Sequence, residues 1–149
     1  MKLRQLNVEG AKVSSLAPLK DMMLTGLAIA YTEVTDLAPV KDMRLTHLNC
    51  SFTKVSDLAP LKNMRLDTVS CAFTLVSDLA PLKGMPLTNL DCRGTKVADL
   101  SLLKEMPVKE LQCDVKSAVQ HAAMLESIKT LATINGQAAA EFWKKVDGK

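Results

Sequence analysis

Aromatic residues are scarce in this chain, which constrains how a core can be built. Of its 149 residues, 3% are aromatic and 48% are hydrophobic. A core must therefore consist mainly of Leu, Val, Met and Ala, which suits thin stacked coils better than a globule around large rings. No apolar run approaches the ~20 residues of a membrane-spanning helix, and no signal-peptide segment follows Met1. We expect a cytoplasmic protein without a membrane partner, or a piece excised from a longer one.

Catalytic and metal-binding signatures are also missing. The two histidines, His47 and His121, share no motif. His47, Asp67 and Ser70 could be imagined as a triad, but no nucleophile elbow, P-loop or dinucleotide fingerprint accompanies them. The net charge of +3, from 19 basic and 16 acidic residues, is too mild to indicate a nucleic-acid partner. The sequence therefore predicts no enzymatic activity, no cofactor and no metal site.

What the sequence does contain is a repeat of 21 residues, whose clearest copy begins at Leu45 and is most regular up to Met64. The same residue types return at this fixed step in several columns. One such column consists of Leu24, Leu45, Leu66 and Leu87, and another of Met22, Met43, Met64, Met85 and Met106. Self-similarity at a period in the twenties indicates a solenoid, in which each coil packs only on its neighbours.

Each copy divides into a strand and a tight turn. The first half reads L-x-x-L-x-(C/V/I)-x-x-T-x-V, and its alternation of apolar and variable residues predicts a half-buried strand. The second half reads (S/T)-D-L-A-P-L-K. An aspartate such as Asp57 can begin a helical turn, but Pro60 follows too soon for a long helix. A single 3-10 turn fits the available length.

These motifs resemble the leucine-rich-repeat signature, in the short form of the SDS22 and internalin subfamilies. Thr32, Thr53, Thr74 and Thr95 stand where those families often carry Asn. The resemblance covers residues 1–116. It implies one α/β solenoid domain over residues 1–149, with a parallel sheet of six or seven strands, short 3-10 or irregular convex segments and a helical C-terminal cap. It also implies a role in protein–protein recognition.

The tail, residues 117–149, breaks the period and is expected to close the apolar end of the solenoid. Ser117 is predicted to cap a helix that runs to about Glu126. The inner side of this helix is expected to carry Val119, Ala122, Ala123 and Met124. A strand-like segment over residues 128–134, a turn at Asn135-Gly136 and a final helix over residues 137–146 follow.

The tail resembles the C-terminal end of repeat proteins that are abundant in planctomycete bacteria. The similarity lies in Ile128-Lys-Thr-Leu131, Ile134-Asn-Gly136 and Ala140-Glu-Phe-Trp-Lys144. Many of those repeat regions follow a serine/threonine kinase domain. The resemblance implies that this chain is the recognition region of a bacterial signalling kinase, although it carries no kinase motif itself.

The four cysteines form another column with the 21-residue step: Cys50, Cys71, Cys92 and Cys113. Neighbouring strands lie ~4.8 Å apart, so distance alone would allow disulfides between repeats. Val8 and Ile29 hold the same position in the first two repeats, which shows that a small apolar group suits it. We therefore predict four free, buried thiols rather than disulfides or a metal site.

The N-terminal edge carries the apolar residues Leu3, Leu6 and Val8 without a cap comparable to the tail. An open edge strand invites pairing with another chain. Three explanations compete: the chain is cut from a longer protein, two copies form a homodimer through this edge, or the exposure is tolerated.

Variable residues of the strands form four columns on the expected concave face, one of which contains Ala30, Ser51, Ala72 and Arg93. The fourth column carries most of the aromatic residues, Tyr31, Phe52 and Phe73. Aromatic anchors beside polar side chains are typical of protein interfaces, so these rings are predicted to bind a protein partner. The predicted polar rim consists of His47, Asn49, Ser70, Asp91 and Arg93. The competing interpretation is that the rings fold over the strand-to-turn corner and shield its backbone.

A lysine column lies on the expected convex side: Lys20, Lys41, Lys62, Lys83 and Lys104. It could contact a phosphate backbone. Acidic residues follow three of these lysines, however, and the column repeats for structural reasons. A solvated face that discourages aggregation is the favoured interpretation.

Overall fold

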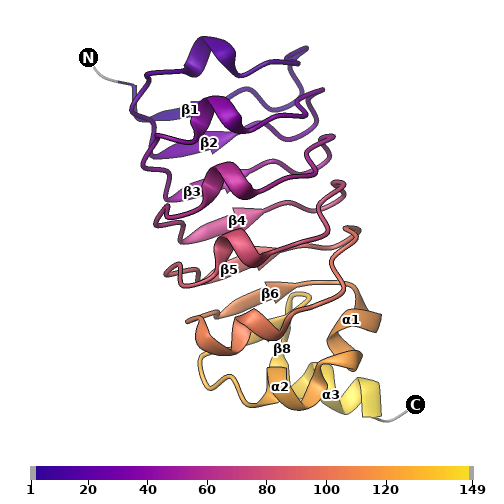
Figure 1. The fold of residues 1–149 in the computed structure, drawn as a ribbon. Coiled ribbons are helices and arrows are strands. Elements are labelled where there is room, and N and C mark those ends of the chain that lie inside the picture. The colour runs from indigo at the N-terminus through magenta and orange to yellow at the C-terminus, as the bar shows by residue number, and fades with distance from the viewer. Residues whose placement is uncertain (1–2, 148–149) are drawn as a thin grey trace.

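The computed structural model describes residues 3–147 and shows a single row of stacked coils. Strands line one side of the row and 3-10 turns line the other, with the first repeat at one end and a helical cap at the opposite end (Figure 1). Eight strands form one sheet in sequence order. They are β1 (Gln5–Asn7), β2 (Gly26–Ala28), β3 (His47–Asn49), β4 (Thr68–Ser70), β5 (Asn89–Asp91), β6 (Glu110–Gln112), β7 (Thr133–Ile134) and β8 (Gln137–Ala138).

The strands from β1 to β7 are parallel, which confirms the predicted parallel sheet of six or seven strands. β8 is an addition and pairs antiparallel with β7 through the expected turn at Asn135-Gly136. Between β1 and β6 the pairing joins residues 21 apart, such as Leu6 with Leu27 and Leu27 with Leu48. Each column of the sequence is therefore a column in space.

The second half of each repeat forms a short 3-10 turn, as predicted. The turns are η1 (Ala17–Leu19), η2 (Ala38–Val40), η3 (Ala59–Leu61), η4 (Ala80–Leu82) and η5 (Ser101–Glu105). Asp57 Oδ1 accepts a hydrogen bond of 2.7 Å from the Ala59 N–H, and Asp36, Asp78 and Asp99 make the equivalent bond. These carboxylates satisfy a backbone donor at the start of each turn, where no helical partner exists.

The fixed apolar columns form one continuous core. The threonine column lies beside it: Thr53 Oγ1 donates to the Cys50 carbonyl at 2.7 Å, and Thr32, Thr74 and Thr95 repeat this bond at 2.6–2.7 Å. A hydroxyl thus satisfies a backbone carbonyl at the turn where related repeats often use an amide. Among the described residues, every buried side-chain nitrogen or oxygen has a hydrogen-bond partner.

The C-terminal cap consists of α1 (Val115–Gln120), α2 (Ala122–Glu126), the β7–β8 hairpin and α3 (Ala139–Asp147). The predicted single helix capped by Ser117 is wrong in two respects. The helix begins at Val115, so Ser117 lies inside it. The helix is also interrupted at His121, where φ is −111° and ψ is 18°, and this interruption separates α1 from α2. This break changes which residues face inward: Ala118 and Leu125 are buried, whereas Val119 is 46% exposed.

Of the other residues predicted to face inward, Ala123 is exposed and Ala122 and Met124 are partly buried. The aromatic pair of the tail closes the core as expected. Phe142 and Trp143 are buried and pack edge to face, with ring centroids 4.9 Å apart. Within the described part of the chain, no helix is long and apolar enough to span a membrane.

The prediction of free, buried thiols is confirmed for Cys50, Cys71, Cys92 and Cys113. Burial disfavours the thiolate and raises the pKa of Cys50 and of Cys113 from about 9 to about 12. The pKa values of Cys71 and Cys92 are raised by the same cause. The thiols are therefore expected to be unreactive in the folded protein.

These thiols make stability depend on pH in the alkaline range. Above about pH 9 the thiols of the unfolded chain ionise, whereas the folded ones remain protonated up to about pH 12. The unfolded state then binds fewer protons, so the free energy of unfolding falls as pH rises through this window. We expect the urea midpoint to decrease from pH 8 to pH 10.5. The double variant Cys50→Val/Cys113→Val should show a shallower decrease, and an identical decrease would contradict this assignment.

Candidate functional site

The exposed face of the sheet contains a shallow hollow of about 550 Å³ across β1 to β4. The small residues Gly26 and Ala28 of β2 contribute to its lining, between polar side chains of the neighbouring strands. The hollow is also lined by Gln5, Asn7, His47, Asn49, Thr68 and Ser70. A step in side-chain size along two columns of the sheet accounts for this depression.

Three of the predicted rim residues, His47, Asn49 and Ser70, lie together in this hollow. Asp91 lines a second hollow of about 210 Å³ across β4 to β6, which also includes Ser70. Arg93 forms a bidentate ion pair with Asp91: its Nε lies 3.0 Å from Oδ1 and its terminal nitrogen lies 2.7 Å from Oδ2. The charges of Asp91 and Arg93 therefore compensate each other.

Hydrogen bonds fix the polar side chains of the larger hollow. Asn49 Nδ2 donates to Glu9 Oε1 at 2.6 Å, although Glu9 belongs to the first repeat and Asn49 to the third. The Ser70 and Ser51 hydroxyls lie 2.6 Å apart. Glu9, which belongs to the same variable column as Ser51, was not among the predicted rim residues, because its bond to Asn49 reaches across the second repeat.

The column that contains Ala30, Ser51, Ala72 and Arg93 does not lie on the surface as expected. Ala30, Ser51 and Ala72 are buried, whereas Glu9 before them is exposed and Arg93 after them is partly exposed. These positions follow the strands, where neighbouring coils and the corner of the repeat cover a small side chain. Their exposure was predicted from strand alternation, which ends with the strands at Ala28, Asn49 and Ser70.

The histidine of the hollow contacts Thr46 and Asp67. His47 Nδ1 lies 2.8 Å from Thr46 Oγ1, and its Nε2 lies 4.0 Å from Asp67 Oδ2. The Ser70 hydroxyl is directed to Ser51 instead of His47. No group of three or more His, Cys, Asp or Glu within residues 3–147 is arranged to hold a metal ion.

Tyr31, Phe52 and Phe73 form a continuous stack just beyond the ends of β2, β3 and β4, which we call the aromatic ladder. Successive ring centroids are 4.5 Å apart, with interplanar angles of 11° and 19°. The side chains remain 63%, 43% and 50% exposed, respectively. The rings therefore shield one another while keeping their edges accessible to solvent, and their role as partner anchors stays a prediction.

The backbone of the ladder adopts a left-handed conformation that side chains seldom tolerate. Its φ angles are 57°, 55° and 54°, and this conformation costs roughly 1–2 kcal/mol for an L-residue. The backbone N–H of each ring residue donates to the next repeat, for example from Phe52 to the Ala72 carbonyl at 2.8 Å. Inter-repeat hydrogen bonds thus hold three bulky residues in a conformation that favours glycine.

Glycines continue the column on both sides of the ladder, at Gly10 and Gly94, again with positive φ. The ring of Phe73 lies directly over Gly94, because a Cβ at Gly94 would come within 2.5 Å of the Phe73 ring. At Gly10 a Cβ would meet nothing within 4 Å. The aromatic stack therefore packs against Gly94 of the fifth repeat, whereas no side chain of the described residues covers Gly10 of the first repeat.

Comparison with solved structures identifies similar folds in two internalins from Listeria monocytogenes. One, inlF, has 25% identity and a TM-score of 0.77, and the match covers 89% of this chain and 40% of that protein. The other, internalin C2, has 20% identity and a TM-score of 0.65, and the match covers 89% of this chain and 70% of that protein. The chain thus spans about two fifths of the inlF structure. No protein-family model and no curated protein matched.

Substitution of Gly94 tests the contact that supports the ladder. Gly94→Ala introduces a Cβ against the Phe73 ring, whereas Gly84→Ala, also at positive φ, introduces one into open space. Both variants should be strained. Gly94→Ala should lower the free energy of unfolding by about 0.5–1.5 kcal/mol more than Gly84→Ala does, which is the typical value of an aromatic contact. Thermal and urea unfolding measure the difference. Equal stability of the two variants would show that the ring does not depend on this glycine.

Proposed function

The chain is a leucine-rich-repeat protein of the short-repeat, internalin-like kind, and on this premise we propose that it binds a protein partner through the exposed face of its sheet. The observation that carries the proposal is the aromatic ladder. Three exposed rings occupy successive repeats in an arrangement that costs backbone strain. Interface energy is usually concentrated in a few such aromatic anchors.

The rigidity of the ladder favours binding because little ordering is needed. Stacking at 4.5 Å restricts each ring, and inter-repeat hydrogen bonds fix the backbone beneath it. A partner that covers the rings therefore gains apolar burial without the cost of ordering several side chains. The neighbouring hollow with His47, Asn49 and Ser70 supplies donors and acceptors for selectivity.

We further propose that this recognition serves a bacterial signalling kinase in the cytoplasm. The resemblance of residues 128–144 to the end of planctomycete repeat regions supports this context. A kinase domain encoded in frame with the chain is the expected finding. Sequencing of the gene that encodes it checks this directly.

Self-association through β1 is a second candidate, favoured by the state of the N-terminal edge. Among the described residues, β1 pairs only with β2. Leu3 is 47% exposed and Leu6 and Val8 are partly buried, whereas Leu27 and Ile29, in the same columns as Leu6 and Val8, are buried. A second copy that paired along β1 would cover these apolar groups and the open backbone edge.

The ladder is tested by removing its middle ring. Phe52→Ser deletes both stacking contacts, and Tyr31→Ser deletes one. The free energy of unfolding should therefore fall by about 1–3 kcal/mol for Phe52→Ser and by about 0.5–1.5 kcal/mol for Tyr31→Ser. A partner captured by photo-crosslinking from position 73 should bind Phe52→Ser about thirtyfold more weakly, the effect of losing roughly 2 kcal/mol at a hot spot. Isothermal titration calorimetry measures this.

The matched control is Val119→Ser, which removes a similarly exposed apolar side chain from α1 in the cap. This variant should bind the captured partner as tightly as the unmodified chain. If Phe52→Ser also binds with unchanged affinity, the ladder has a structural role only.

The edge is tested by placing a charge in β1. Leu6→Lys should convert a dimer into a monomer, because pairing of two edges would bury the ammonium groups in an apolar contact. Light scattering over a range of protein concentrations reports the molar mass. A mass that is the same for both proteins at every concentration would exclude assembly through this edge.

A further inference from the structure

A second surface, away from the exposed face of the sheet, lies where each coil leaves its 3-10 turn and enters the next strand. Three hollows occur there, of about 310, 540 and 520 Å³. The first two share Asp42, Met43 and Arg44, and the last two share Asn63, Met64 and Arg65. Because they share these residues, the hollows form one row along the repeats, which we call the basic groove.

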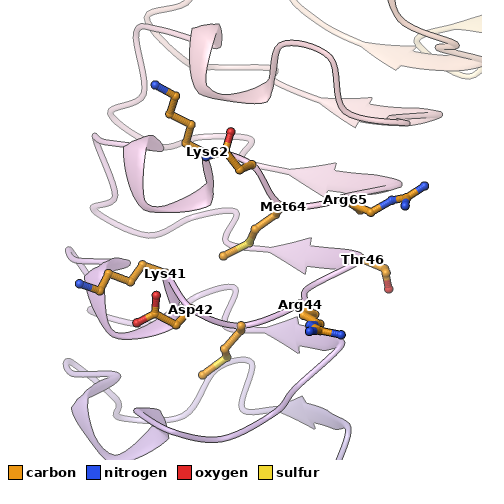
Figure 2. A pocket seen from close by; sticks show the side chains of 9 residues that line it. Lys41, Asp42, Arg44, Thr46, Lys62, Met64 and Arg65 are labelled. Carbon is orange, nitrogen blue, oxygen red and sulfur yellow. The ribbon is translucent and has the colours of Figure 1, made fainter.

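The basic groove has an apolar floor and cationic rims (Figure 2). Met43, Met64 and Met85 are nearly buried and contribute to its lining, while Met23 is 66% exposed at its N-terminal end. In Figure 2, Arg44 and Arg65 extend on one side of the groove and Lys41 and Lys62 on the other, with Met64 between them. The groove thus offers an apolar strip between two rows of positive charge.

The charges of the basic groove are not compensated within the protein. Six cations line it, against the two acids Asp42 and Glu105, which gives a local net charge of +4. The six cations are Arg4, Lys41, Arg44, Lys62, Arg65 and Lys83. Within residues 3–147, none of these six side chains forms an ion pair or a side-chain hydrogen bond, whereas Lys54, Arg93 and Lys144 elsewhere are paired with carboxylates.

The local charge exceeds the net charge of the whole chain, which is +3. Charge of one sign at a hollowed surface raises the local concentration of ligands of the opposite sign. The lysine column alone would be a solvated face. The three arginines and the methionine floor add bidentate donors and an apolar contact surface, which a solvated face does not require.

We propose that the basic groove binds an acidic, extended segment of a protein partner. Carboxylates of the segment contact the arginine and lysine rims, and apolar side chains between them lie on the methionine floor. Nucleic acid fits less well, because no aromatic residue lines the groove and single-stranded nucleic acids are usually held by stacking on aromatic rings. This surface is separate from the ladder, so the proposal does not rest on the function proposed above.

Fluorescence anisotropy with defined probes tests the proposal on the full chain. The probe is the labelled peptide Glu-Glu-Leu-Glu-Glu-Leu-Glu-Glu, and its counterparts are the same peptide with Lys for Glu and a ten-nucleotide deoxythymidine strand. We expect the acidic peptide to bind in a salt-dependent manner and the lysine peptide not to bind. The variant Arg44→Gln/Arg65→Gln should weaken binding about fivefold or more, since it removes two charge pairs.

The matched control is Lys96→Gln/Lys129→Gln, which removes the same charge from exposed positions outside the groove. It should change the affinity less than twofold. Met23→Gln should weaken binding of the leucine-containing peptide but not of a peptide with Ser in place of Leu. Phe52→Ser should leave all these affinities unchanged, so failure here is distinguishable from failure of the ladder.

Two results would overturn the proposal. Equal losses of affinity for the acidic peptide in the groove variant and in the control variant would show that only the overall charge of the protein attracts the peptide. Tighter binding of the deoxythymidine strand than of the acidic peptide, lost in Arg44→Gln/Arg65→Gln, would assign the groove to nucleic acid instead.

Discussion

The pairing of parallel strands at an offset of one repeat is the interaction on which the rest of this structure depends. Because every strand from β1 to β6 meets its neighbour at the same register, equivalent side chains stack directly above one another. The leucine, valine, methionine and cysteine columns thereby form a core that contains no aromatic ring until the cap adds Phe142 and Trp143. A slip of one residue would turn these columns out of the core.

The same register determines the surfaces. A left-handed corner that glycine occupies in the first and fifth repeats places rings at stacking distance in the three repeats between them. At the opposite ends of the strands, it places Arg44 and Arg65 in one column, with Arg65 above Arg44 in Figure 2, and Met43 and Met64 in the next column. One geometric rule thus produces two surfaces of different chemistry, an aromatic ladder and a basic groove, neither of which needs a long loop.

Much of the fold and part of the site could be predicted from the sequence, because a repeat converts spacing into position. The parallel sheet, the 3-10 turns begun by aspartate, the buried thiols and the closeness of His47, Asn49 and Ser70 all follow from columns. The exceptions depend on side-chain reach or on the loss of periodicity. The Glu9–Asn49 bond crosses two repeats, Arg93 folds back on Asp91, and the break at His121 alters the inward face of the cap.

The closing hairpin has a consequence for how this architecture can vary in length. β8 is antiparallel to β7, so the series of parallel strands ends at β7. Within the array, by contrast, each coil presents the same backbone to both neighbours. Duplication of residues 45–65 in place would insert one complete coil without disturbing either end. Each such duplication would add one ring to the aromatic ladder and one arginine to the basic groove. Gene duplication alone can therefore enlarge both surfaces together.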